Sequence, residues 1–213
     1  MDIVAPLVKG LVIGLSIAAP VGPIGLLCIR RTLADGPVHG LATGLGAASA
    51  DAVYGAIAGF GLSAVSDWLI GREGGLRLFG GLMLLWMGIA TLRARPAPAA
   101  AGPAVARAVG DTGGLLRAYG STFMLTLANP ATILSFVAVF GALGLAGPAG
   151  ATHLAVALVT GVFLGSALWW LGLSTGVGAV RHRVTPAAMV WINRASGAVL
   201  AGFGLTALAS LLA

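Results

Sequence analysis

The sequence predicts an all-α membrane protein with six transmembrane helices, and two observations support this. Only 8% of the 213 residues are charged and 58% are hydrophobic, whereas soluble domains carry about 25% charged residues. Long stretches also lack any charge, with 20 residues between Lys9 and Arg30 and 63 between Arg117 and Arg181. A soluble chain of this length could not cover so much apolar surface. The composition therefore excludes a soluble enzyme, a nucleic-acid-binding module and a disordered protein.

Six apolar segments are long enough to cross a bilayer, which takes about 20 residues. They cover residues 6–29, 39–65, 75–92, 118–145, 152–179 and 187–212. Residues 93–117 differ because they are rich in arginine and proline, so they are expected to form a linker. The whole chain, 1–213, is predicted to be a single transmembrane domain with a first three-helix half, 1–92, and a second, 118–213.

The loop charges predict the orientation in the membrane. Eight arginines fall in the first, third and fifth connections: Arg30, Arg31, Arg93, Arg95, Arg107, Arg117, Arg181 and Arg183. Positively charged loops stay on the cytoplasmic side. We therefore expect the odd connections in the cytoplasm and both termini in the periplasm.

The two halves resemble each other. Gly81 and Gly88 in the third segment are seven residues apart, as are Gly197 and Gly204 in the sixth. Aligning Gly81 with Gly197 therefore also pairs Gly88 with Gly204. Because each half has an odd number of spans, the predicted repeat is inverted in the membrane. Interrupted helices at matching places in two such halves indicate a transporter binding site.

The first interruption is Pro20-Val21-Gly22-Pro23. Each proline removes a backbone donor and clashes with the preceding turn, so helix 1 should break here. In lipid, the freed backbone groups need protein partners or a water-filled cavity. The amino end of the half-helix favours a carboxylate, so Pro20, Gly22 and Pro23 are candidate substrate-binding residues. The alternative is a kink that serves only packing.

The second interruption is Asn129-Pro130, in helix 4. The residue before a proline is pushed away from helical geometry, and Asn129 offers both a donor and an acceptor. Thr126 and Thr132 lie close enough in sequence to satisfy freed backbone groups. Asn129 and Pro130 are therefore candidate substrate-binding residues. The alternative is an asparagine that bonds a neighbouring helix.

Asp51 is the acidic residue within the predicted spans, and small residues surround it in Gly44-Leu-Gly-Ala-Ala-Ser-Ala-Asp51. A carboxylate inside a bilayer is costly and usually faces a partner or a cavity. Two functional roles stay open: proton coupling, or binding the ammonium group of a substrate. The alternative is a structural aspartate.

The fifth segment carries Gly161 and Gly165, followed by Ser166, Trp169 and Trp170. The glycine pair predicts close helix packing. The tryptophans belong either to an interfacial aromatic belt or, if they lie deeper, to a cavity wall. Ser166 and Trp169 are included among the candidate substrate-binding residues.

Other kinds of chemistry have little support. The single Cys28 excludes a redox cysteine pair. His39, His153 and His182 form no cluster with metal-ligand spacing, so no metal site is predicted. Catalytic motifs such as a Walker loop or HExxH are absent from the sequence, so no catalytic residue is expected.

Several of these motifs together resemble the lysine exporter family (LysE/RhtB type) of amino-acid efflux transporters. They are APVGP at 19–23, LLCIRRTLADG at 26–36, GLGAASAD at 44–51, LANPATIL at 127–134, GVFLGSALWW at 161–170 and INRASG at 192–197. The resemblance implies a bacterial inner-membrane carrier that exports amino acids or close relatives, driven by the proton-motive force and without a cofactor. The sequence departs from the family pattern in two places: Val21 separates Pro20 from Gly22, and Ala131 stands where a lysine often follows Asn-Pro. The missing lysine weakens any transfer of substrate identity.

The sequence therefore predicts a secondary exporter whose partners are a small-molecule substrate and membrane lipids, not nucleic acid. Its substrate carboxylate would meet backbone amides near Gly22–Ile24 or Ala131–Ile133, and Asp51 would take the ammonium or the coupled proton. Glycine-rich helix faces are compatible with a homodimer. The main alternative is a cation or metal exporter of the same broad superfamily; a membrane oxidoreductase and a structural scaffold are further alternatives.

Overall fold

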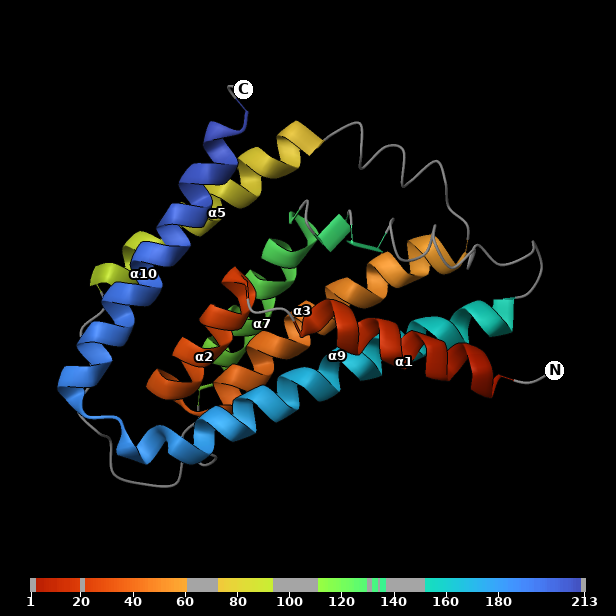
Figure 1. The fold of residues 1–213 in the computed structure, drawn as a ribbon, viewed down its shortest axis with the longest axis horizontal. Helices are drawn as coiled ribbons and strands as arrows, with labels where there is room; N and C mark the ends of the chain where they lie inside the picture. Colours follow the sequence, from red (N-terminus) through yellow and green to blue (C-terminus); the bar gives the residue numbers. More distant parts are fainter. Residues whose placement is uncertain are drawn as a thin grey trace.

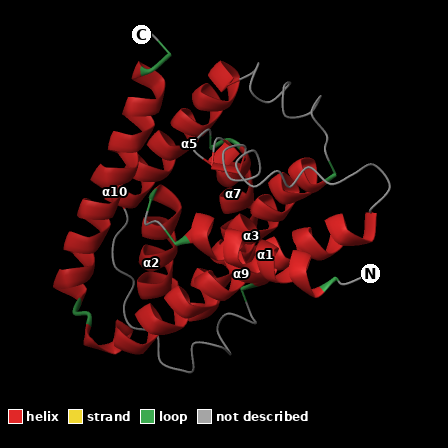
Figure 2. Ribbon diagram, turned by 45° about the vertical axis from the view of Figure 1, so that its right-hand side comes forward, coloured by secondary structure: helices red, strands yellow, loops and turns green. Residues whose placement is uncertain are grey.

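The computed structural model describes residues 3–19, 22–60, 73–93, 111–129, 132–133, 135–136 and 152–211. The regular structure in these ranges is helical (Figure 2). The elements are α1 (Val4–Ala18), α2 (Pro23–Asp35), α3 (Pro37–Gly59), α5 (Glu73–Arg93), α7 (Thr112–Leu127), α9 (Thr152–Val180), the short 3₁₀ helix η1 (Arg181–Arg183) and α10 (Pro186–Ala209).

Proline and glycine determine where the first helices begin and end. α1 ends at Ala18 and α2 begins at Pro23, and the two axes differ by 80°. Pro23 occupies the first helical position, where its missing N–H costs no hydrogen bond. Gly36 then closes α2 and opens α3 with φ 105°, a left-handed conformation that suits glycine. The chain can therefore reverse between α2 and α3 without a long loop.

Glycines let three pairs of helices approach closely. A Cβ atom on Gly10, Gly14, Gly161 or Gly165 would collide with the backbone of the partner helix, so α1 and α9 cross with their backbones nearly touching. Residue numbers rise together along this contact, so the two helices run in parallel. The close packing predicted for Gly161 and Gly165 is confirmed.

The second glycine-packed pair is α5 and α10, which lie side by side at the edge of the molecule (Figure 1). A Cβ on Gly88 would lie 2.8 Å from the carbonyl oxygen of Gly197, and a Cβ on Gly204 would lie 2.8 Å from that of Gly81. Residue numbers run in opposite directions along this contact, so the pair is antiparallel. The third pair is α3 and α7, which meet at Gly46.

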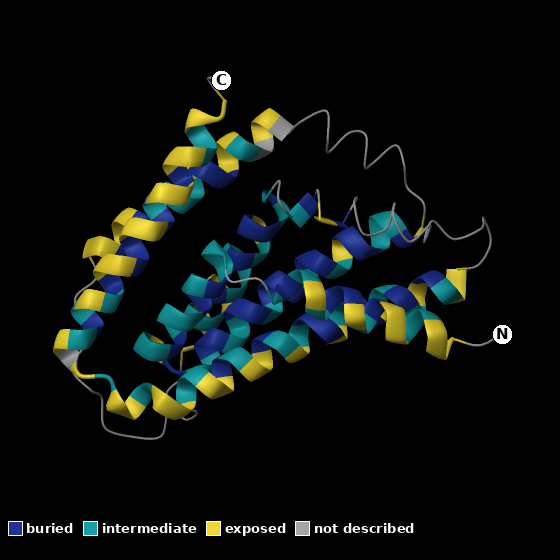
Figure 3. Ribbon diagram, viewed as in Figure 1, coloured by how far each residue is buried: buried dark blue, intermediate teal, exposed yellow. Residues whose placement is uncertain are grey.

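The distribution of side chains is that of a membrane protein. Large apolar residues face outward on α1, α3, α5, α7, α9 and α10, with Trp86 66%, Trp191 69% and Leu116 72% exposed (Figure 3). Polar residues lie inside: Thr32, Thr43, Asp51, Thr122, Thr126, Ser166, Ser174, Asn193 and Ser196 are buried. A soluble monomer seldom exposes so much contiguous apolar surface. In lipid the arrangement is favourable, because the bilayer solvates the apolar faces.

Each predicted span contains at least one observed helix. By length and composition alone, the helical stretch Thr152–Arg183 could cross a membrane by itself, and α1 with α2 could do so as one broken span. The boundaries of α2 and α7 differ from the sequence prediction. α2 continues to Asp35, so Arg30 and Arg31 lie on a helix rather than in a loop. α7 begins at Thr112, so Arg117 lies on a helix rather than in the predicted linker 93–117. Most of the predicted linker, residues 94–110, lies outside the described residues.

Candidate functional site

The centre of the molecule contains a buried polar pair formed by α3 and α9. Ser166 Oγ donates a hydrogen bond of 2.7 Å to Asp51 Oδ2, and Trp170 Nε1 donates one of 3.1 Å to the same Ser166 Oγ. Asp51 is 4% exposed and Ser166 is fully buried. The structure therefore brings together two candidates, Asp51 and Ser166, that the sequence separates by 115 residues.

Small residues make room for this pair. On the α3 side, Ala47, Ala48 and Ala50 are completely or almost completely buried around Asp51. A Cβ on Gly44 would collide with the side chain of Trp170. The glycine is therefore what allows the indole to lie against α3 and reach Ser166.

The polar pair lies between two apolar clusters. One cluster, a turn beyond Asp51, contains Ile13, Tyr54, Ile133, Phe136, Leu158 and Val162. The other contains Ala18, Cys28, Ala47, Ala48 and Trp170, with Ile24 packed against it. Residues next to both helix interruptions thus take part: Ala18 and Ile24 flank the first, and Ile133 and Phe136 follow the second. The two interruptions and the Asp51–Ser166 pair share one region of the fold.

The first interruption leaves a helix end without a side-chain cap. Gly22 precedes α2 with extended backbone, and no side chain of a described residue is seen to hydrogen-bond the amide groups of the first turn. No atom of a described residue lies within 4 Å of the place where a Cβ on Gly22 would stand. Pro23 lacks an N–H, and the N–H groups of Ile24 and Gly25 have no hydrogen-bond acceptor among the described residues. Pro20 and Val21 lie outside the described residues.

The second interruption is bonded to the first half of the chain. α7 ends at Leu127, and the Tyr54 hydroxyl donates a short hydrogen bond to the Leu127 carbonyl oxygen. Tyr54 stands one turn after Asp51 on α3, so one helix contacts both the polar pair and the interruption. Asn129 has left the helix, and its N–H bonds the Thr126 carbonyl oxygen at 3.1 Å. Pro130 lies outside the described residues.

Thr126 was expected to satisfy a freed backbone group, and its side chain does not do so among the described residues. Its hydroxyl oxygen is buried without a hydrogen-bond partner there. A buried hydroxyl in this state costs about 1–3 kcal/mol. Thr126 therefore offers a donor and an acceptor close to the interruption.

Of the two tryptophans, Trp170 is the one that joins the polar pair. Trp169, the candidate chosen from the sequence, is partly buried and packs against the cluster that contains Trp170. Tyr54 was not anticipated at all, although its spacing of three residues from Asp51 places it on the same helix face.

The end of the molecule that carries the odd connections is rich in arginine contacts. Arg31 donates hydrogen bonds of 2.9–3.1 Å to Thr43, Ala118, Ser121 and Thr122. Arg181 donates two bonds of 2.8 Å to the carbonyl oxygens of Leu33 and Ala34, at the carboxyl end of α2. These bonds join α2 to α3, α7 and η1 at one end of the molecule.

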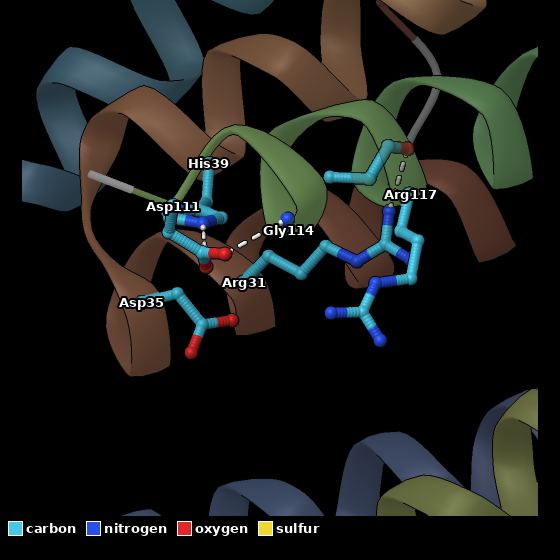
Figure 4. A pocket seen from close by; sticks show the side chains of 7 residues that line it. Arg31, Asp35, His39, Asp111, Gly114 and Arg117 are labelled. Atoms are coloured by element: carbon cyan, nitrogen blue, oxygen red, sulfur yellow. Dashed lines mark hydrogen bonds and ion pairs between the residues drawn. The ribbon is translucent and has the colours of Figure 1, made fainter. Parts of the chain in front are cut away.

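Asp111 and His39 close the same end. Asp111 caps α7 by accepting a 2.9 Å hydrogen bond from the Gly114 N–H, and it lies 3.2 Å from His39 Nε2. The Gly114 N–H, and after it His39, hold the pKa of the exposed Asp111 carboxyl below its usual value. Beside this contact is a pocket of about 230 Å³ lined by residues of α2, α3 and α7 (Figure 4).

The fold and the central pair define a class of protein: a helical membrane protein with a buried carboxylate beside interrupted helices, an arrangement typical of transporters. The model of the family "LysE type translocator" matches residues 15–211, and the chain belongs to this family.

The chain is 28% identical over 196 residues to the protein named "Putative amino acid efflux protein YcgF" from Bacillus subtilis (strain 168). The match covers 91% of this chain and 90% of that one. No solved structure matches the chain.

Proposed function

We propose that this protein exports amino acids or closely related small metabolites across the bacterial inner membrane, coupled to the proton-motive force. The observation that carries the proposal is the buried Asp51–Ser166 pair beside two helix interruptions. Membership of the translocator family and the name of the Bacillus relative support the substrate class.

An inverted repeat is supported by matching contacts in the two halves. A Cβ on Gly46 would meet the Tyr119 carbonyl oxygen, and a Cβ on Gly161 would meet that of Leu7. Gly46 and Gly161 are 115 residues apart, the same separation as Asp51 and Ser166. α3 thus contacts α7 as α9 contacts α1, and Asp51 and Ser166 occupy equivalent positions.

The outer helices repeat this correspondence. Gly81 packs against Gly204, and Gly88 packs against Gly197. In the proposed repeat, Gly81 is equivalent to Gly197 and Gly88 to Gly204. The Gly81–Gly204 contact is therefore equivalent to the Gly88–Gly197 contact. Such reciprocal contacts are those of a twofold axis. The Asp51–Ser166 hydrogen bond would lie on that axis, where a rocking motion of the halves keeps a site central.

In the proposed mechanism, the N–H groups of Ile24 and Gly25 donate hydrogen bonds to the substrate carboxylate, helped by the dipole of α2. Asp51 takes either the substrate ammonium or the coupled proton. Binding at Asp51 would weaken the Ser166 bond that joins α3 to α9. Because these helices belong to different halves, the change would favour movement of one half against the other.

The test is efflux from proteoliposomes loaded with a mixed pool of labelled amino acids, with and without an imposed pH gradient. We expect selective, gradient-dependent loss of one or two amino acids. Asp51→Asn should abolish the coupled flux and leave a folded protein. Glu73→Gln, which removes a carboxylate at the start of α5, is the matched control and should keep the flux. Unchanged gradient-driven efflux by Asp51→Asn would exclude the coupling role.

A further inference from the structure

A second polar site lies at the arginine-rich end, away from the central pair. Its pocket is lined by Arg31 and Asp35 of α2, His39 of α3, and Asp111, Gly114, Arg117 and Ala118 at the start of α7. Its volume of about 230 Å³ is below the roughly 300–1,000 Å³ of sites for drug-sized ligands. A ligand that fills it must therefore be small.

The pocket separates charges of opposite sign. Figure 4 shows the carboxylates of Asp35 and Asp111 on one side and the guanidinium groups of Arg31 and Arg117 on the other. A molecule with an ammonium at one end and a carboxylate at the other matches this distribution. A simple anion or cation would meet repulsion on one side.

Two of the four charged groups are already engaged in structural contacts. Arg31 donates to four oxygens of α3 and α7, and Asp111 accepts from Gly114 and faces His39. Removing either would disturb the fold.

The other two charged groups form no ion pair among the described residues, although Asp35 interacts electrostatically with Arg31 and Arg117 with Asp111. Arg117 uses its Nε–H on the Gly113 carbonyl oxygen at 3.3 Å, and its two terminal nitrogens have no partner among the described residues. Asp35 is exposed and makes no hydrogen bond or ion pair within that part of the chain. One cation and one carboxylate that form no ion pair among the described residues therefore line the same pocket.

His39, one of the residues that line the pocket, also carries a buried ring nitrogen without a partner in the described part of the chain. His39 is 8% exposed, and its Nδ1 is buried without a hydrogen-bond partner in the described residues. When Nε2 carries the proton that bonds Asp111, Nδ1 is an acceptor.

We propose that this pocket is a loading site that holds a free α-amino acid, its carboxylate on Arg117 and its ammonium on Asp35. The proposal rests on the proposed export function, because the pocket lies at the end predicted to be cytoplasmic, where an exporter takes up its substrate. The polar face of α7, with Thr122 and then Thr126, leads from this pocket toward the second interruption. The same ammonium-and-acid chemistry also occurs in the headgroup of phosphatidylethanolamine.

The first experiment measures binding in phosphatidylcholine nanodiscs by equilibrium dialysis with each L-amino acid in turn. The amino acid that binds most tightly is then compared with its amide and with its deaminated acid. Arg117→Gln should raise the Kd of the amino acid at least tenfold and leave that of the amide unchanged. Asp35→Asn should raise the Kd of the amino acid by a similar factor and leave the Kd of the deaminated acid unchanged. Both side chains are exposed, so folding should survive.

Arg183→Gln is the matched control, because Arg183 is an exposed arginine of the same end that does not line the pocket. It should bind the amino acid as the unaltered protein does. The proposal would be overturned if Arg117→Gln changed the Kd of the amino acid and of its amide equally, or changed neither. If phosphatidylethanolamine stabilises the protein and no amino acid does, and if Arg117→Gln and Asp35→Asn each remove this stabilisation, the pocket binds a lipid headgroup. That result would overturn the loading role.

Transport separates this proposal from the export function itself. In proteoliposomes, Arg117→Gln should raise the KM at the loading side about tenfold and change kcat less than twofold, the pattern of lost ground-state binding. If the unaltered protein exports amino acids and both variants keep its KM, the loading site is wrong and the export function stands. If the unaltered protein exports no amino acid, the export function is wrong. The binding experiment still shows whether the pocket binds an amino acid.

Discussion

The Asp51–Ser166 hydrogen bond allows a quantitative prediction. Ser166→Ala removes the donor and puts no water in its place, because Ser166 is fully buried and Asp51 is 4% exposed. Hydrogen bonds between membrane helices average about 0.6 kcal/mol and reach about 1.7, whereas bonds to charged groups contribute about 1.5–3. The bond measures 2.7 Å and its acceptor is a carboxylate. We therefore expect a coupling energy of about 1.5–3 kcal/mol between the two side chains.

The assay is a double-mutant cycle that compares Asp51→Ala, Ser166→Ala and the double variant, because an asparagine at position 51 would keep an acceptor for the Ser166 hydroxyl. Unfolding is followed in mixed detergent micelles at neutral pH. Ser166→Ala also leaves Trp170 Nε1 without its acceptor, but this loss occurs in both variants that lack Ser166 and cancels in the cycle. Thr175→Ala is the control, because Thr175 is an exposed hydroxyl on α9 that bonds its own helix. A coupling energy within about 0.5 kcal/mol of zero would refute the argument, since independent sites add within that margin.

Three further predictions concern packing, the second interruption and the arginine-rich end. Gly165→Ala should lower the melting temperature clearly, because the added Cβ would collide with the backbone of α1. Gly172→Ala should leave the melting temperature unchanged, because its Cβ would meet nothing within 4 Å. Equal effects of the two substitutions would exclude the close approach of α1 and α9. Tyr54→Phe should destabilise by about 1–3 kcal/mol, because the Leu127 carbonyl loses its buried donor, and a neutral result in detergent unfolding would contradict this. Asp111→Ala should lower the melting temperature at pH 7 and have little effect once the pH falls below the lowered pKa of the Asp111 carboxyl. The reason is that the stability contributed by a carboxylate with a depressed pKa is lost when it is protonated. An equal fall in melting temperature at both pH values would argue against this role of Asp111.

The helical segments could be predicted because they depend on local chemistry. Uncharged apolar runs indicate membrane helices, and Pro23, Gly36 and Pro37 mark the turns at which α2 and α3 begin. The length of α2 could not be predicted this way. Arg30 and Arg31 resemble loop charges, but Asn193 on α10 and four oxygens of α3 and α7 satisfy them. Those partners lie far away in the sequence.

In the candidate site, too, some features could be predicted from the local sequence and others depend on residues far away in the chain. Asp51 stands out because a carboxylate within an apolar segment requires an explanation. Its partner does not, since Ser166 is one of several small polar residues in the chain. The choice between Trp169 and Trp170 depends on which face of α9 meets Gly44. Tyr54 could have been suspected from its place one turn from Asp51, but its acceptor, Leu127, is a backbone carbonyl that carries no sequence signal.

The sequence by itself determined that the chain is a membrane protein, where its helices are interrupted, and that Asp51 is exceptional. These properties follow from hydrophobicity, from the missing N–H of proline and from the cost of a charge in lipid, all of which act locally. The tertiary structure alone decided that Asp51 meets Ser166, that Tyr54 holds the second interruption, and that Asp35 and Arg117 face one pocket. These contacts depend on how closely glycine-lined helices approach, and that approach is set by the packing of both halves together.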